Sequence, residues 1–209
     1  MTNALLAAAP DNLPESLLQH LPSAIAAAQK NVDWLSENKK VQYAELTLQF
    51  SQLSSAQNNP ATRLQRIRFI AGEWSKLITE VGACRKGCNH CCHIAVLMPK
   101  SEAKLIAKAS GRKLNKTTHG VELGTAIDHT KYHGTPCTFL KDGACSVYAS
   151  RPFVCRTLAN MDDSPILCEL VPGVDVPVPH ANAFRLQTSF VAIAHAEKYA
   201  DIREWFAPD

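Results

Sequence analysis

Cysteine is missing from the first 83 residues and from the last 41, although this 209-residue chain contains eight cysteines. All eight therefore lie between Cys84 and Cys168. No apolar run approaches the ~20 residues of a membrane-spanning helix, and the N-terminus lacks the basic start of a secretory signal. We expect a soluble, cytoplasmic protein that does not enter a membrane. In that compartment, clustered cysteines favour metal or redox chemistry over structural disulfides.

Glycine is absent from residues 1–71, which suits helices. The chain also lacks a glycine-rich phosphate loop, a dinucleotide-binding fingerprint and a G-x-S-x-G nucleophile elbow. A content of 46% hydrophobic and 20% charged residues is enough for a buried core and excludes a disordered tail. The sequence identifies no substrate, reaction or partner.

Charge and cysteine divide the chain into three parts, which we expect to share one domain. Residues 1–83 form a helical N-terminal part in which Lys/Arg and Asp/Glu balance at seven each. Residues 84–168 form a cysteine-rich metal-binding part with twelve Lys/Arg against six Asp/Glu, a net charge of +6. Residues 169–209 form a C-terminal loop and helix with a net charge of −3.

Apolar residues recur at spacings of three and four over several segments, the pattern of a helix with one buried face. The predicted helices cover 14–55, 62–81, 101–110 and 182–206. Pro22 is expected to separate a short first helix from a longer one capped by Ser23. The fold class is mostly α: a helical frame around an irregular, cysteine-rich insertion with a short β-hairpin.

Four thiols fall within nine residues in the first cysteine cluster, at Cys84, Cys88, Cys91 and Cys92. In a helix they would point to one side, and in a glycine-containing loop Cys88 and Cys91 would form a C-x2-C metal knuckle. The adjacent Cys91 and Cys92 side chains diverge, which suits a multinuclear centre or a ligand with a neighbouring thiol. Buried apolar cysteines and a disulfide cluster are the alternatives.

A second stretch contributes Cys137, Cys145 and Cys155. Asp142-Gly143 predicts a hairpin bend that brings Cys137 and Cys145 together. Pro152 is expected in the first turn of a helix carrying Cys155.

Two arginines, Arg151 and Arg156, flank Cys155. Because buried thiolates need charge compensation, we expect these arginines to stabilise the centre rather than to bind an external anion.

The pattern C-x3-C-x2-C-C, followed by P-C-x-F-L-x4-C-S-V-Y-x2-R-P-x2-C-R, resembles the bacterial CxxCxxCC family, also called YkgJ-like cysteine-cluster proteins. The resemblance covers about residues 84–156. It implies a zinc or iron centre. If the metal is iron, an iron–sulfur cluster is one form that the centre could take. The implied metal ligands are Cys84, Cys88, Cys91, Cys92, Cys137, Cys145 and Cys155. Cys168 lies outside the motif and is an accessory candidate.

Three kinds of function stay open. The first is a metal-binding module. The second is an iron–sulfur or zinc enzyme for redox chemistry or for methyl transfer to protein lysine, because flagellin lysine N-methylases carry a similar cluster. The third is a zinc-stabilised adaptor that binds protein or nucleic acid. A strip of basic residues favours nucleic-acid binding. The strip consists of Lys100, Lys104, Lys108, Arg112, Lys113 and Lys116, and no aromatic residue interleaves with it.

Histidines near the cysteines are weaker candidates. His90 and His93 flank the Cys91-Cys92 pair, and we expect them to donate hydrogen bonds to thiolates rather than to bind metal. His129 and His133 have a spacing that binds metal on a helix, but the surrounding residues favour a solvated loop.

Overall fold

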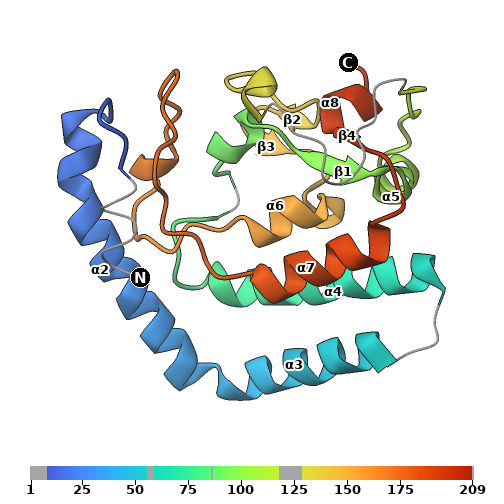
Figure 1. Ribbon diagram of the computed structural model, residues 1–209, viewed down its shortest axis with the longest axis horizontal. Coiled ribbons are helices and arrows are strands. Elements are labelled where there is room, and N and C mark those ends of the chain that lie inside the picture. Colours follow the sequence, from blue (N-terminus) through green and yellow to red (C-terminus); the bar gives the residue numbers. More distant parts are fainter. Residues whose placement is uncertain (1–8, 56–58, 86, 118–128, 209) are drawn as a thin grey trace.

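The computed structural model describes residues 9–55, 59–85, 87–117 and 129–208, and it is mostly α-helical, as predicted (Figure 1). The helices are α2 (Glu15–Asn38), α3 (Lys40–Ser55), α4 (Pro60–Ile78), α5 (Lys100–Ser110), α6 (Phe153–Thr157), α7 (Phe184–Ala194) and α8 (Ile202–Trp205). Four 3₁₀ turns join them: η1 (His90–His93), η2 (His129–Tyr132), η3 (Tyr148–Ser150) and η4 (Ile166–Cys168). None of the helices within the described residues could cross a membrane.

Two small antiparallel pairs of strands lie above α4, α6 and α7 in Figure 1. Strand β2 (Leu140–Lys141) pairs with β3 (Ala144–Cys145), which confirms the predicted hairpin. Its two-residue turn places Asp142 and Gly143 at φ angles of 50° and 74°, the left-handed conformation that such turns require. Strand β1 (Leu97–Pro99) pairs with β4 (Tyr199–Asp201), so the C-terminus joins the cysteine-rich part.

The predicted break at Pro22 is wrong, because Pro22 lies inside α2. Leu21 and Ala24 beside it are fully buried and pack with Leu167 of η4. Burial of this apolar face outweighs the lost backbone hydrogen bond at proline. Ser23 is not a cap: its hydroxyl donates to the carbonyl of His20 at 2.8 Å. The helix ends instead at Asn38.

The predicted final helix over 182–206 is also wrong beyond residue 194. The chain leaves α7 and adds β4 to the edge of β1. Asp201 then caps α8 by accepting from the backbone N–H of Arg203 at 2.8 Å. Backbone pairing with a distant strand overrides the local helical pattern, as tertiary contacts often do.

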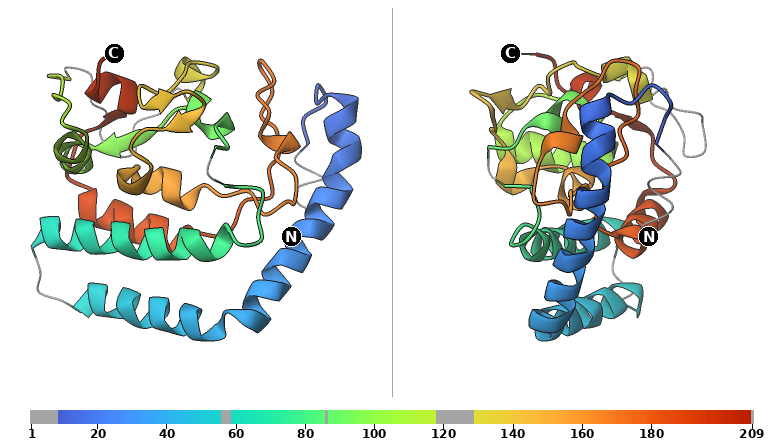
Figure 2. Two further views of the ribbon diagram at one scale, coloured as in Figure 1. Left: turned by 180° about the vertical axis from the view of Figure 1, so that it is seen from behind. Right: turned by 90° about the vertical axis from the view of Figure 1, so that its left-hand side faces the viewer.

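Helix α4 lies at the centre of the main core, between α3 and α7 (Figure 2). Its Ile67 and Ala71 are fully buried, and Phe153 of α6 stacks on Phe190 of α7 with ring centroids 4.1 Å apart. A second core under the cysteine-rich part includes Phe139 and other fully buried residues from three segments. The helical frame and the cysteine-rich part therefore share buried surfaces.

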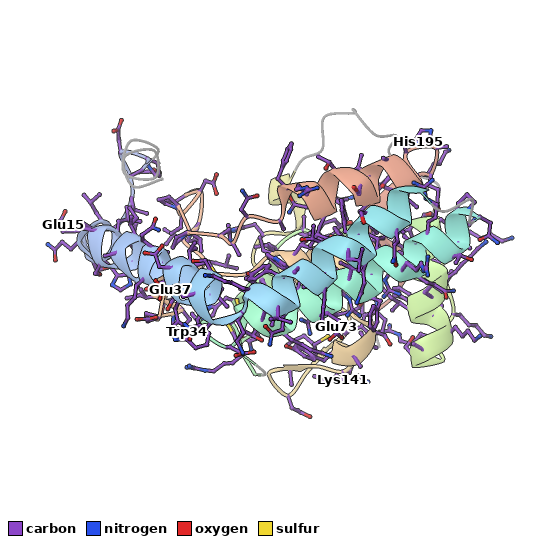
Figure 3. The ribbon with its side chains drawn as sticks, turned by 90° about the horizontal axis from the view of Figure 1, so that it is seen from below. Glu15, Trp34, Glu37, Glu73, Lys141 and His195 are labelled. Atoms are coloured by element: carbon purple, nitrogen blue, oxygen red, sulfur yellow. The ribbon has the colours of Figure 1, made fainter. Side chains whose placement is uncertain are left out.

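Helix α2 runs along one side of the molecule and braces the loop after α6. Figure 3 shows its course from Glu15 at one end to Trp34 and Glu37 near α3. The buried Asn31 amide donates to the carbonyls of Val81 and Met161 at 3.1 and 2.9 Å. The Asn31 side chain thus connects Val81, just before Cys84, to Met161 in the loop that follows Cys155.

Removing the Asp201 carboxylate should be strongly destabilising. This 1% exposed side chain accepts from the Val96 N–H at 2.6 Å and pairs with Arg203 at 2.9 Å. Asp201→Ala leaves a buried cation unpaired, so we expect a loss of about 3–5 kcal/mol in the free energy of unfolding by urea. Asp11→Ala, at an exposed carboxylate, should change it by less than about 0.5 kcal/mol. Equal effects would contradict this role of Asp201.

Candidate metal centre

The first cysteine cluster starts directly after α4, where the chain passes very close to the loop following α6. A Cβ added at Gly82 would lie 2.4 Å from the carbonyl oxygen of Asn160. Beyond Cys84 the chain turns through Gly87 at a φ of 95° and enters η1, which carries Cys91 and Cys92. The cluster is therefore a glycine-containing loop with one 3₁₀ turn, not an α-helix.

Backbone hydrogen bonds join the two cysteine stretches directly. The N–H of Cys137 donates to the carbonyl of Cys92 at 2.7 Å, and the N–H of Gly134 donates to the carbonyl of His93 at 2.8 Å. These bonds bring together residues separated by more than 40 positions in the sequence.

Arg203 reinforces this junction from the C-terminus. Its guanidinium donates to the carbonyl of Cys92 at 3.2 Å and to those of Thr135 and Pro136 at 2.5 and 3.1 Å. Sequence reasoning missed this residue because no spacing relates a C-terminal arginine to the cysteine motif. Its neighbour Asp201 was the one available signal of a buried ion pair.

Cys155 is positioned by a buried ion pair between two helices of the frame. Arg68 of α4 donates to Glu102 of α5 at 2.7 Å. The same carboxylate oxygen accepts from the N–H of Phe153, the first residue of α6, at 2.7 Å. Burial raises the pKa of Glu102, and the nearby Arg68 opposes this shift. The ion pair therefore fixes where the short helix with Cys155 begins.

All seven motif cysteines line one cavity of about 100 Å³. These residues are Cys84, Cys88, Cys91, Cys92, Cys137, Cys145 and Cys155. Cys91 is exposed, and Cys137 is buried. The expected convergence of the two stretches is thus present in the fold, while the role of each cysteine as a ligand stays a prediction.

The cavity is wider than a coordination sphere. Among the residues the structure describes, no three Cys, His, Asp or Glu side chains are arranged to hold a metal ion as they stand. A zinc–sulfur bond is about 2.3 Å long, so binding requires the thiols to move inward. The donor set nevertheless fits zinc or iron, because thiolates select these metals over magnesium or calcium.

The thiols of the centre are mostly neutral in the absence of metal. Burial raises the pKa of Cys84, Cys137, Cys145 and Cys155, most strongly for Cys155. Cys91 is the exception, because a hydrogen bond from the Cys92 thiol lowers its pKa to about 7. Cys91 therefore ionises more easily than the thiols whose pKa is raised, and metal binding to those thiols must release their protons.

Arg151, like Arg85, is a cation of the cavity lining. It lines the cavity wall, and its charge lowers the pKa of Cys84, Cys91 and Cys145. The guanidinium donates to the Ser75 hydroxyl at 2.9 Å. These contacts support the expected role of Arg151 in charge compensation, which stays a prediction.

Arg156 supports the centre through backbone carbonyls rather than through a contact with sulfur. Its guanidinium donates to the carbonyls of Arg151 and Ala149 at 3.0 and 2.8 Å. Burial lowers the pKa of Arg156 to about 10, so it remains charged at neutral pH. It therefore orders the turn from which Arg151 reaches the cavity.

The histidine candidates and the residues of the basic strip are not among the described residues that line the cavity. His93 pairs with the carbonyl of Asn89 at 3.1 Å, and neither His90 nor His93 is among the residues lining the cavity. His133 is exposed, and the His129 side chain lies outside the described residues. In the strip, Arg112 packs over Phe139, with its guanidinium carbon 4.8 Å from the ring centroid.

Metal-free protein should lose stability as the pH rises. Folding raises the pKa of these thiols above the ordinary value of 9.0. As the pH rises, they therefore lose their protons in the unfolded chain before they do so in the folded protein. Between about pH 8 and pH 10, the free energy of unfolding should fall by up to about 1.4 kcal/mol per pH unit for each such thiol. Thermal melts with chelator would show a falling melting temperature. A rise over this range would contradict the assigned protonation states.

Truncating Arg156 should weaken the centre without touching a sulfur. Arg156→Ala removes two hydrogen bonds from a charged donor, each worth about 1.5–3 kcal/mol, and we expect a lower melting temperature and lower metal content. Arg185→Ala on α7, at a site lining another cavity, is the control. Unchanged melting and metal content, with lost binding of an acidic ligand or nucleic acid, would show a binding role instead.

Comparison with known proteins agrees with this geometry. Residues 83–172 match the CxxCxxCC family model, described as a "putative zinc- or iron-chelating domain". No curated protein and no solved structure matches the chain. The match begins one residue before Cys84 and includes Cys168 as well as the seven cysteines of the cavity. The cysteine-rich part of this chain, residues 83–172, is thus similar to the CxxCxxCC family.

Proposed function

We propose that this chain binds zinc or iron through Cys84, Cys88, Cys91, Cys92, Cys137, Cys145 and Cys155. The single observation that carries the proposal is that all seven line one cavity together with Arg151. Thiols that came together only as apolar residues would not need a half-buried guanidinium beside them. The match to a chelating domain supports the same chemistry.

The number of thiols favours more than one metal ion, or an iron–sulfur cluster with additional thiols around it. A structural zinc ion takes four ligands, and seven cysteines line the cavity. The Cys92 thiol donates a hydrogen bond to the Cys91 sulfur, so we infer that the two would bind neighbouring metal ions, or that one would bind metal and the other would lie beside it.

The metal would also organise the fold around it. The segment between α5 and α6 contains only two-residue strands and 3₁₀ turns within the described residues. Binding energy at structural zinc sites is about 10–16 kcal/mol, comparable with the stability of a whole domain. We place the protein in a reducing compartment such as the cytoplasm, because its eight cysteines are free thiols.

Metal analysis of anaerobically purified protein tests the function. We expect bound zinc or iron, with a brown colour and absorption near 400 nm if the iron is in a cluster. The double variant Cys137→Ser/Cys155→Ser should lose most of the metal, because both residues line the cavity. Thr188→Ala, at an exposed position on α7, should retain it.

The same preparation tests the structural role of the metal. After chelation, amide hydrogen exchange should accelerate more in residues 84–156 than in α4 and α7, which have their own apolar core. Protein that is purified without metal, and whose melting temperature does not respond to added zinc or ferrous iron, would refute metal binding. A uniform loss of protection would refute the helical frame as an independent unit.

A further inference from the structure

Asn160 lies in the loop after α6 and contacts two thiols from distant parts of the chain. Its backbone N–H donates to the Cys84 sulfur at 3.3 Å, and its side-chain amide donates to the Cys168 sulfur at 3.4 Å. The amide also donates to the carbonyl of Ser164 at 3.1 Å, and its oxygen accepts from the N–H of Asp162 at 2.8 Å. With 1% of its surface exposed, Asn160 has no access to bulk water.

The backbone around Asn160 is fixed from two sides before any metal binds. On one side, Asn160 forms a β-bridge with His180, and the N–H of Met161 donates to the carbonyl of Pro179 at 2.9 Å. On the other side, the close approach at Gly82 brings the Asn160 carbonyl against the chain just before Cys84. The two donors of Asn160 are therefore preorganised, and the thiols adapt to them.

Cys168 lies near the first cluster although it does not line the cavity. The sulfur atom is within hydrogen-bonding distance of the residue that also contacts Cys84. Burial, together with the nearby Cys84, Cys88 and Cys91 sulfurs, raises the pKa of Cys168 to about 12. The eighth cysteine therefore shares an electrostatic environment with the first cluster.

We propose that Asn160 is a positioning residue of the metal centre, which orients the Cys84 and Cys168 sulfurs by donating one N–H to each. This inference rests on the proposed metal binding. A thiolate bound to a metal accepts hydrogen bonds but cannot donate one, and both Asn160 contacts are donors. The bonds become stronger when the thiols lose their protons, because hydrogen bonds to charged acceptors are the stronger class.

Hydrogen-bond donors to a ligating atom also influence how tightly the metal binds. They fix the orientation of the ligating atom and withdraw electron density from it, and their loss typically costs about 10–100-fold in metal affinity. The orientation of Cys84 depends on a backbone N–H that no side-chain substitution removes. The amide donated to Cys168 can be removed by substitution, so it is the contact to test.

Asn160→Asp is the sharpest variant. It conserves the size of the side chain and the oxygen that accepts from Asp162, but it replaces the nitrogen that donates to Cys168 and to the Ser164 carbonyl with a negatively charged oxygen. The probe is cobalt(II), added anaerobically to metal-free protein, because its thiolate charge-transfer bands report on sulfur ligation. We expect these bands to shift or weaken and the cobalt affinity to fall about 10–100-fold.

Asn31→Ala is the matched control. Asn31 is also buried and donates to Met161 in the same loop, but it has no hydrogen bond to a sulfur within the part of the chain that the structure describes. We expect this variant to lower the melting temperature and to keep the cobalt spectrum of the wild type. If both variants change the spectrum equally, or if Asn160→Asp leaves it unchanged, Asn160 does not position the thiols.

Alkylation of the wild-type protein provides a readout that does not depend on a variant that folds. Iodoacetamide labelling followed by peptide mass spectrometry should show cobalt protecting Cys168 together with Cys84. Protection of Cys84 without Cys168 would overturn the proposal. Wild-type protein that binds no cobalt, zinc or iron would refute the proposed function itself, an outcome distinct from either result above.

Discussion

The hydrogen bond from Cys137 to Cys92 is the contact on which the centre depends. At 2.7 Å it joins the ends of two segments that have little regular structure of their own. The cysteines of both stretches line one cavity beside this junction. Bringing thiols together raises their pKa through burial and mutual charge. Holding these thiols together therefore costs folding free energy, and binding of a soft cation would offset this cost.

Residues outside the cysteine-rich domain supply much of the support. Arg68 of α4 fixes the start of α6, Arg203 near the C-terminus holds the junction of the two stretches, and Asn31 of α2 braces the loop with Asn160. All three side chains donate hydrogen bonds to backbone carbonyls. The terminal parts therefore act on the centre through directed polar contacts as well as through apolar packing.

The sequence predicts the fold where local chemistry dominates. The Asp-Gly pair specifies the hairpin turn, and the apolar spacing predicts α4 and α5 to within two or three residues. It fails where distant contacts decide: packing against η4 carries α2 through Pro22, and pairing with β1 makes a strand of residues 199–201. Cysteine spacing suffices to predict that seven thiols meet. The donors Arg203 and Asn160 escape prediction, because only the tertiary structure places them beside the thiols.

Gly82 has a consequence for how much change the chain can tolerate. Its backbone does not have a positive φ, so glycine is required there by space and not by conformation. A methyl group would need to retreat from 2.4 Å to an ordinary contact of 3.4 Å from the Asn160 carbonyl, a separation of about one ångström. That is more than a hydrogen bond to sulfur tolerates at its present length. Gly82 therefore sets the distance between the two chain segments, and even Gly82→Ala would change the geometry of a site that begins two residues later, at Cys84.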